Sequence, residues 1–231
     1  MSCKLNIILD LDSTIINSIY PENIHLIPRD TPLKYQKIND SGMTTFERPF
    51  LQEFLDYLFE NFNVGVLTHG VKSYGLEIVW RFIQSKPNRK VDFVIARDTV
   101  EFAMKLYPGT LKDLRYIWDD IKQYDYYPCN TFIIDDNLLV KQTNPYNTIS
   151  VYPFELLKED GNTIVYNNYA EYDNTLLEVK KELEKLKNSY NSKECSFHNQ
   201  RTRCLNLRKQ SLPIPEKVEN KKVGRFFIYD V

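Results

Sequence analysis

The sequence is poor in the residues that stabilise secreted proteins or cross membranes. Its four cysteines in 231 residues lack the spacing of a disulfide framework, and Cys195, His198 and Cys204 lack the fourth ligand of a zinc site. No segment approaches the roughly 18 consecutive apolar residues of a membrane-spanning helix, and no signal peptide is recognisable. We therefore expect an intracellular, soluble protein, cytoplasmic or nuclear, that does not contact membranes.

Glycine is also scarce, with seven residues, while tyrosine, asparagine, isoleucine and lysine are frequent. This bias is typical of an A/T-rich genome, such as that of a large DNA virus or a parasite. The chain is long enough, and with 42% hydrophobic residues apolar enough, to bury one sizeable core. No internal repeat or low-complexity block divides it.

Positive charge is concentrated at one end of the chain. Residues 191–231 hold nine Lys or Arg against four Asp or Glu, whereas residues 1–190 hold 21 against 27. We therefore predict a folded domain over 1–190 and a basic, partly flexible tail over 191–231, whose last apolar run, 226–231, docks as an edge strand. Contact of the tail with nucleic acid or an acidic partner is the alternative to a solvated segment, which is the interpretation we prefer.

Apolar runs alternate with amphipathic segments along the predicted domain. Continuous apolar runs predict buried strands at residues 5–9, 64–67, 91–96, 131–134 and 148–154. Apolar residues at helical spacing predict helices at residues 50–62, 75–83, 111–121 and 171–187. This alternation is typical of a doubly wound, mostly parallel α/β sheet with helices on both faces. Two alternating runs around the turn NDSG predict a small β-hairpin insert at about 33–48.

Polar side chains follow three of the predicted strands at the point where each strand ends. Asp10 and Asp12 follow the first strand, Thr68 follows the second, and Asp135 and Asp136 follow the fourth. Parallel α/β sheets bind ligands at the carboxyl ends of their strands, so one crevice can collect these residues. The alternative is that the acids only cap turns or helices.

Several carboxylates in one cleft repel each other, and they need a cation or shared protons to stay ionised. Hard oxygen ligands favour Mg²⁺ over zinc, with Asp10 and Asp136 as its ligands. Such a site suits phosphoryl transfer, in which Asp10 attacks phosphorus and Asp12 protonates the leaving oxygen and later activates water. The loop amides at Thr68 and the charge of Lys112 would bind the phosphoryl oxygens.

Four segments, spread over roughly residues 5–155, resemble the motifs of the haloacid dehalogenase superfamily in their order and spacing. Within it they are similar to the serine phosphatases that act on the C-terminal domain of RNA polymerase II. The segments are DLDSTIINS, FERPFLQEFLDYLFENFNVGVLTHG, LKDL and FIIDDN. The residues in register with the family's motifs are Asp10, Asp12, Thr14, Arg48, Pro49, Thr68, Lys112, Asp135 and Asp136.

The resemblance implies a Rossmann-like core without a large cap domain, and a role for each matched residue. The implied catalytic residues are Asp10, Asp12, Thr68, Lys112 and Asp135, the last of which orients Lys112. The implied substrate-binding residues are Thr14, Thr68, His69, Gly70 and Lys112. The implied ligands of Mg²⁺ are Asp10, Asp12 and Asp136. His69 and Gly70 stand where the family commonly has small polar residues, and residues 84–110 match no motif.

An open site without a cap admits a protein side chain, so the implied substrate is a phosphorylated protein or peptide. The same chemistry on a small metabolite or a nucleic-acid end is the first alternative. The second is a binding module without catalysis, like related proteins of the mitochondrial import machinery. The presence of nucleophile, acid, threonine, lysine and metal-binding acids together argues against the binding module. The sequence gives no indication of the oligomeric state.

Overall fold

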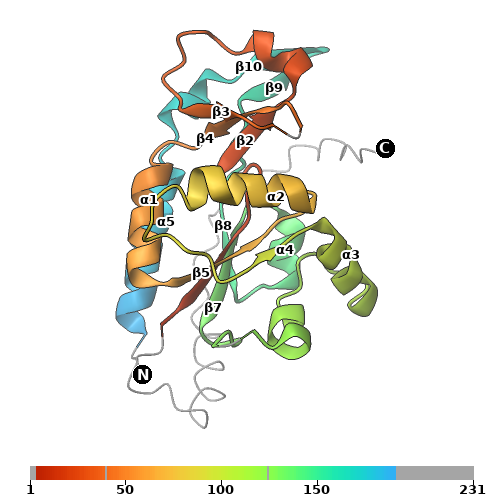
Figure 1. The fold of residues 1–231 in the computed structure, drawn as a ribbon, viewed down its shortest axis with the longest axis vertical. Coiled ribbons are helices and arrows are strands. Elements are labelled where there is room, and N and C mark those ends of the chain that lie inside the picture. Colours follow the sequence, from red (N-terminus) through yellow and green to blue (C-terminus); the bar gives the residue numbers. More distant parts are fainter. Residues whose placement is uncertain (1–3, 40, 124, 191–231) are drawn as a thin grey trace.

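The structure is a computed structural model, in which residues 4–39, 41–123 and 125–190 are described (Figure 1). The predicted tail at 191–231 and its edge strand at 226–231 lie outside the described residues. None of the helices in the described ranges is long and apolar enough to cross a membrane.

Five parallel strands form the central sheet in the order β6-β5-β1-β7-β8 (Figure 1). They are β1 (Asn6–Leu9), β5 (Asn63–Leu67), β6 (Val94–Ile95), β7 (Thr131–Asp135) and β8 (Thr148–Ser150). β1 lies in the middle, and all four of its residues are buried, in agreement with its continuous apolar run. The predicted α/β class with a mostly parallel sheet is confirmed.

Helices cover both faces of this sheet. Ile7 and Leu9 of β1 pack into one core cluster and Ile8 into another, because successive residues of a strand point to opposite faces. The helices of the first cluster are α1 (Leu51–Asn61), α2 (Lys72–Ile78) and α5 (Thr175–Ser189). The helices of the second are α3 (Arg97–Leu106) and α4 (Leu138–Thr143). The π-helical turn Val79–Ile83 continues α2.

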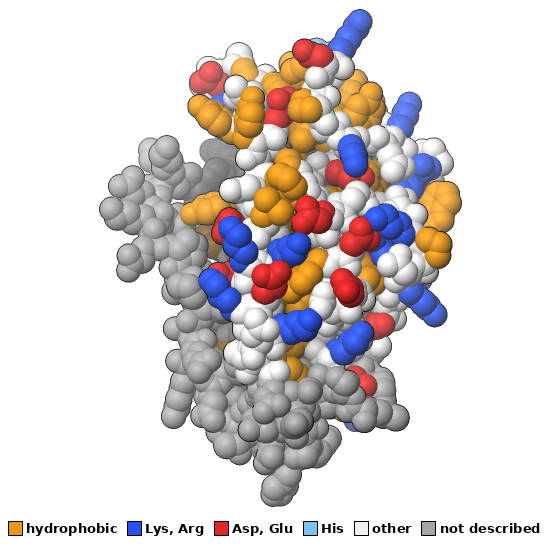
Figure 2. Space-filling model, turned by 90° about the vertical axis from the view of Figure 1, so that its left-hand side faces the viewer, with side chains coloured by type: hydrophobic (Ala, Val, Ile, Leu, Met, Phe, Trp, Pro, Cys, Tyr) orange, Lys and Arg blue, Asp and Glu red, His pale blue; other side chains and the backbone are white. Residues whose placement is uncertain are grey.

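Charged side chains of both signs are mixed on the face that α1 and α5 form (Figure 2). Several of them are paired, for example Lys180 with Glu53 at 3.0 Å and Lys181 with Glu178 at 2.9 Å. A face with such mixed charge offers no strongly acidic or basic surface, which is typical of a solvated exterior.

The two edge strands are shorter than predicted. The run at 91–96 contributes only two residues to β6, and the run at 148–154 contributes only three to β8. Each of these strands pairs with one neighbour only. The apolar residues next to them can therefore pack into the core without being part of a strand.

The helices between residues 97 and 143 also differ from the predictions. The helix predicted at 111–121 is reduced to the π-helical turn Tyr116–Ile121, because Lys112 has a left-handed backbone (φ 49°) that an α-helix excludes. α3 and α4 were not predicted. In α3 only Val100 and Ala103 are buried, so its apolar periodicity is weak.

A small lobe of antiparallel strands lies at one end of the central sheet, at the top of Figure 1. Its three-stranded sheet has the order β2-β4-β3, with β2 (Ile16–Ile19), β3 (Tyr35–Lys37) and β4 (Thr44–Glu47). A hairpin follows β8 and consists of β9 (Leu157–Asp160) and β10 (Thr163–Tyr166). The short helical turns of the lobe are Pro21–Leu26 and Asn168–Tyr172.

The insert predicted at 33–48 is therefore only part of this lobe. Ile19 and Phe46 of its sheet share a buried cluster with Phe154 and Leu156, which follow β8. A hairpin alone could not bury its apolar face, and the distant segment supplies the missing partner. Pairing between segments so far apart leaves no local sequence signal.

Buried Arg48 ties the lobe to the core. Its Nη1 donates to the Thr14 carbonyl at 2.8 Å, and its Nη2 donates to the Tyr152 carbonyl at 2.9 Å. Nε and Nη2 also donate to the two carboxylate oxygens of Asp173, at 2.9 and 2.8 Å. Burial would raise the pKa of Asp173, but Arg48 outweighs burial and lowers it. One guanidinium thus joins three loops that lie far apart in the sequence.

Replacing Arg48 with methionine should lower the free energy of unfolding by about 3 to 5 kcal/mol, because Asp173 and two carbonyls would lose their buried donor. Urea unfolding measures this loss. Lys181→Met, which removes an exposed cation of a surface pair, is the matched control and should change stability little. Equal effects of the two substitutions would show that the contacts of Arg48 do not stabilise the fold.

Candidate active site

A cleft of about 350 Å³ lies at the carboxyl ends of β1, β5 and β7. The predicted site residues that line it are Asp10, Asp12, Thr68, His69, Gly70, Lys112 and Asp136. Its other lining residues are Ser13, Arg97, Leu111 and Asn137. The two remaining predicted residues, Thr14 and Asp135, are fully buried and bonded to residues that line the cleft.

The Lys112 ammonium group lies between two carboxylates. Its Nζ is 2.6 Å from Asp10 Oδ1 and 2.8 Å from Asp135 Oδ2, and only 4% of its side chain is exposed. Burial alone would lower the pKa of Lys112, but the charges of Asp10 and Asp135 outweigh burial and raise it. Lys112 is therefore a permanent cation that compensates part of the negative charge of the cleft.

The end of α4 holds the backbone around Lys112. Asn144 Nδ2 donates to the Lys112 carbonyl at 3.0 Å, and Asn144 Oδ1 accepts from the Leu114 N–H at 3.1 Å. Thr143 Oγ1 accepts from the Leu111 N–H at 3.0 Å. The sequence analysis missed Thr143 and Asn144, because their contacts exist only where α4 ends beside this loop.

Thr14 lies behind two of the acids. Its Oγ1 is 3.2 Å from Asp10 Oδ2 and 3.0 Å from Asp136 Oδ1, and it accepts a bond from the Asp136 N–H at 3.2 Å. Thr14 was predicted to bind substrate, but it is fully buried and does not line the cleft. Its hydroxyl orients the two carboxylates.

The carboxylates of Asp10, Asp135 and Asp136 form a candidate cation site. One oxygen from each lies within 4.8 Å of the others. Such hard oxygen donors fit Mg²⁺ better than zinc. Both oxygens of Asp135 already accept bonds, Oδ2 from Lys112 and Oδ1 from the Asn137 N–H. Both oxygens of Asp10 are engaged as well, Oδ1 by Lys112 and Oδ2 by Thr14, whereas the contact of Asp136 with Thr14 involves Oδ1.

The Asp12 side chain has a different partner. Its Oδ1 accepts a hydrogen bond of 2.5 Å from the Tyr74 hydroxyl. Asp12 is not one of the three acids that converge on the candidate cation site. Its predicted role as a metal ligand therefore finds no support in the position of its carboxylate.

Burial and mutual repulsion make the acids of the cleft reluctant to ionise. The pKa of Asp12 and that of Asp136 are each raised to about 6, and the pKa of Asp135 is raised to about 7. Burial is the largest cause in each case, and the Asp10 carboxylate adds to it. The positive charge of Lys112 alone does not balance these carboxylates.

The loop after β5 is shaped by one glycine. Thr68 Oγ1 accepts a bond of 3.0 Å from the Gly70 N–H. A Cβ atom at Gly70 would lie 2.8 Å from the Tyr74 ring and 3.3 Å from Thr68 Oγ1, so a larger residue would displace one of them. His69 beside it has a pKa lowered by burial and by Arg97, which favours the neutral imidazole.

Arg97 is a further cation of the cleft that the sequence analysis missed. It begins α3 directly after β6, and its Nε donates to the His69 carbonyl at 2.9 Å. The rule that functional side chains follow strand ends, applied to the third strand, would have found it.

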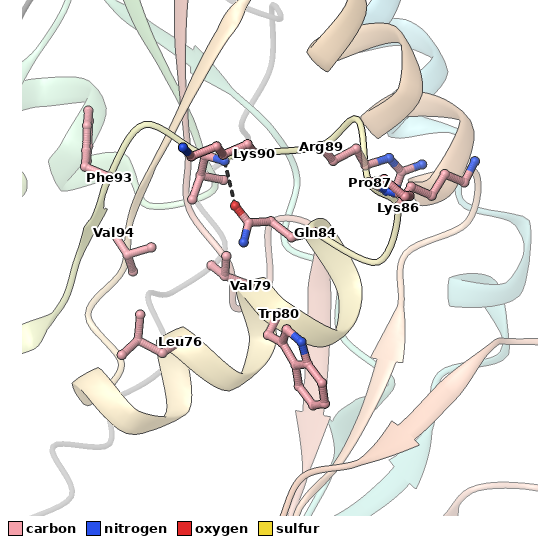
Figure 3. A pocket seen from close by; sticks show the side chains of 11 residues that line it. Leu76, Val79, Trp80, Gln84, Lys86, Pro87, Arg89, Lys90, Phe93 and Val94 are labelled. Atoms are coloured by element: carbon pink, nitrogen blue, oxygen red, sulfur yellow. Dashed lines mark hydrogen bonds between the residues drawn. The ribbon is translucent and has the colours of Figure 1, made fainter.

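A second depression, of about 730 Å³, lies outside this cleft (Figure 3). Figure 3 shows Leu76, Val79 and Val94 around it, and Gln84 accepting a bond of 2.7 Å from the Val91 N–H. None of the predicted site residues lines this depression, and it contains no carboxylate. Its size alone does not make it a catalytic site, because the groups for phosphoryl transfer lie in the smaller cleft.

Comparison with known proteins identifies the family of the chain. The sequence model of the NLI interacting factor-like phosphatase family matches residues 5–194. The chain belongs to this family. This NLI interacting factor-like protein is therefore a phosphatase of the haloacid dehalogenase type, and the resemblance found in its sequence motifs is confirmed.

Two relatives of this chain are viral proteins. The CTD phosphatase-like protein 355R of Invertebrate iridescent virus 6 is 34% identical over 182 residues, which cover 76% of this chain and 94% of the relative. Its counterpart in Invertebrate iridescent virus 3 is 32% identical over 193 residues, which cover 80% of this chain and 97% of the relative. The compositional bias toward a large DNA virus agrees with these relatives.

The fold is shared with a solved phosphatase. The structure of Fcp1, an essential RNA polymerase II CTD phosphatase, matches with a TM-score of 0.55 and covers 87% of this chain and 67% of Fcp1. At 19% identity this match establishes the common architecture of the two proteins.

The change of the free energy of unfolding with pH should reveal the raised pKa values. Asp136 binds its proton more tightly in the folded protein than in the unfolded chain, so its contribution to stability falls as the pH rises from 3.8 to about 6. Asp136→Asn should therefore gain stability relative to the wild type across this range. Urea unfolding with a chelator present measures the difference, with exposed Asp160→Asn as control. A difference that does not change with pH would contradict the raised pKa.

Proposed function

We propose that this protein is a Mg²⁺-dependent phosphatase that hydrolyses phosphoserine or phosphothreonine in proteins or peptides through an aspartyl-phosphate on Asp10. The observation that carries the proposal is the position of Asp10 in the cleft, bonded to buried Lys112 on one oxygen and near Thr14 on the other. A carboxylate held by these two contacts is oriented, as a nucleophile must be.

The reaction has two steps. In the first, a carboxylate oxygen of Asp10 forms a bond to phosphorus while the bond to the leaving oxygen breaks, and Asp12 gives that oxygen a proton. In the second, Asp12 takes a proton from a water molecule that attacks phosphorus, and the bond to Asp10 breaks. The raised pKa of Asp12, about 6, suits a group that must both give and accept a proton near neutral pH.

Phosphoryl oxygens need donors and positive charge. The candidates that line the cleft are the Thr68 hydroxyl, the His69 N–H and the Lys112 ammonium group, because the N–H groups of Thr68 and Gly70 already donate to the Ile95 carbonyl and to Thr68 Oγ1. The guanidinium of Arg97 lines the same cleft and adds a second cation for a phosphate or for an acidic neighbour of it.

Mg²⁺ would be bound by Asp10 and Asp136, with Asp135 orienting Lys112. The ion pair of 2.8 Å between Lys112 and Asp135 supports this role of Asp135, and the resemblance to the family's motifs assigns Asp10 and Asp136 to the metal. The chemistry that such an ion supplies is neutralisation of the charge shared by carboxylates and phosphoryl group.

The substrate class rests on the shape of the site and on relatives. Neither a large cap nor a lid closes over the cleft among the residues that the structure describes, so a peptide side chain can enter. Fcp1 is described as an RNA polymerase II CTD phosphatase, and the viral relatives as CTD phosphatase-like. We therefore propose a phosphorylated protein as the substrate, rather than a metabolite or a nucleic-acid end. We likewise propose catalysis rather than a binding role. A cytoplasmic or nuclear location stays a prediction, as does the solvated state of the tail, to which contact with nucleic acid is the alternative.

Asp10→Asn should reduce hydrolysis of an aryl phosphate by about 10⁴-fold or more, because the amide is a poor nucleophile. A chelator should abolish the activity of the wild type, and added Mg²⁺ should restore it. Asp160→Asn, an acid on the exposed hairpin, is the matched control and should remain active. Full activity of Asp10→Asn would exclude the aspartyl-phosphate, and an inactive wild type in Mg²⁺ would favour the binding module.

The ratio kcat/KM should be about 10-fold or more higher for phosphoserine or phosphothreonine peptides than for sugar phosphates. Peptides with repeats of the polymerase tail, unrelated phosphopeptides, sugar phosphates and 5′-phosphorylated oligonucleotides form the panel. Preference for a sugar phosphate or an oligonucleotide would overturn the proposed substrate class. Preference for the tail repeats over other phosphopeptides would narrow it.

A further inference from the structure

Asp12 is the end of a chain of hydroxyl groups that begins in the small lobe. Tyr74 OH lies 2.5 Å from Asp12 Oδ1 and 2.7 Å from Ser18 Oγ. Ser18 Oγ lies 2.7 Å from Thr45 Oγ1. Ser18 and Thr45 are paired residues of β2 and β4, whereas Tyr74 lies on α2 in the core domain. The chain therefore connects the lobe to the residue that we assign as general acid.

The hydroxyl groups of this series must all donate in one direction, because each carries a single proton. The Tyr74 hydroxyl has a single proton, which it donates to Asp12 Oδ1. Ser18 must then donate to Tyr74, and Thr45 in turn to Ser18. Hydroxyl groups that all donate toward one carboxylate polarise one another and strengthen the last bond.

The surroundings of Tyr74 fit this arrangement. Only 6% of the residue is exposed, and its ring lies against Gly70, where any Cβ atom would come within 2.8 Å of it. Strand pairing fixes the backbone of Ser18 and Thr45, at the lobe end of this series of hydroxyl groups. Packing and backbone pairing thus set the position of the Tyr74 hydroxyl before substrate binds.

We propose that Tyr74, held by Ser18 and Thr45 of the small lobe, is a positioning residue that fixes the Asp12 carboxyl group for proton transfer to the leaving oxygen. This inference rests on the proposed function, because it assigns how that function's general acid is oriented. Tyr74 occupies Oδ1, which leaves Oδ2 of Asp12 as the atom that carries the transferred proton.

The atoms of the step balance as follows. The proton on Asp12 Oδ2 moves to the serine oxygen as the bond between that oxygen and phosphorus breaks and the bond from Asp10 to phosphorus forms. Asp12 is left as a carboxylate, whose Oδ1 still accepts from Tyr74. Without Tyr74 the carboxyl group can rotate, and the proton is no longer held at the leaving oxygen.

Leaving groups of different basicity separate this role from simple packing. The oxygen of serine is strongly basic and needs a proton to leave, whereas the oxygen of p-nitrophenyl phosphate leaves without one. The ratio kcat/KM reports steps only up to the first irreversible one, here formation of the aspartyl-phosphate. Loss of positioning must therefore reduce kcat/KM for a phosphoserine peptide far more than for p-nitrophenyl phosphate.

Tyr74→Phe should lower kcat/KM for a phosphoserine peptide by about 10-fold or more and change that for p-nitrophenyl phosphate by less than about 3-fold. Ser18→Ala should give a smaller loss with the same selectivity. Tyr126→Phe is the matched control, since Tyr126 is equally buried and donates to Asp92 at 2.8 Å outside the cleft. It should change neither substrate's kcat/KM.

A double-mutant cycle gives a second, independent measurement. In an Asp12→Asn background, Tyr74→Phe should cause no further selective loss, because the group that it positions is already gone. An equal loss on both substrates, no loss, or an undiminished selective loss without Asp12 would each overturn the proposal. A wild type without Mg²⁺-dependent turnover of either substrate would instead remove the proposed function and this inference with it.

Discussion

The buried ammonium group of Lys112 is the interaction on which the site depends. A cation with 4% of its side chain exposed would be strongly unfavourable alone, and two buried carboxylates beside it would be equally so. Asp10 and Asp135 lie within 2.8 Å of Lys112 and make the three charges tolerable together. Each of them comes from the end of a different strand or loop, so the site exists only when the sheet is assembled.

Charge compensation in the cleft is incomplete. One lysine faces a cluster in which the pKa values of three acids are raised to about 6 or 7. The raised pKa values follow in part from the gathering of oxygen donors where a phosphoryl group and a divalent ion would bind. Repulsion among these acids lowers the stability of the fold. The hydrogen bonds of Arg48 to three loops offset part of this loss.

The small lobe is connected to the cleft by hydrogen bonds as well as by the polypeptide backbone. Its three-stranded sheet shares a buried core with the segment after β8. Through Ser18 and Tyr74 it also reaches Asp12. The same antiparallel strands that leave the site uncovered can therefore set the geometry of its acid.

The sequence by itself determined the parallel α/β core and most residues of the candidate site, because buried strands need continuous apolar runs and functional side chains follow their ends. Asp10, Asp136 and Thr68 were predicted in this way, and the family motifs supported the choice of Lys112. The partners that orient these residues, among them Tyr74 and Asn144, were decided only by the tertiary structure. Hydrogen bonds between segments far apart in the chain depend on how helices and loops pack, and packing leaves no periodic signal in the sequence.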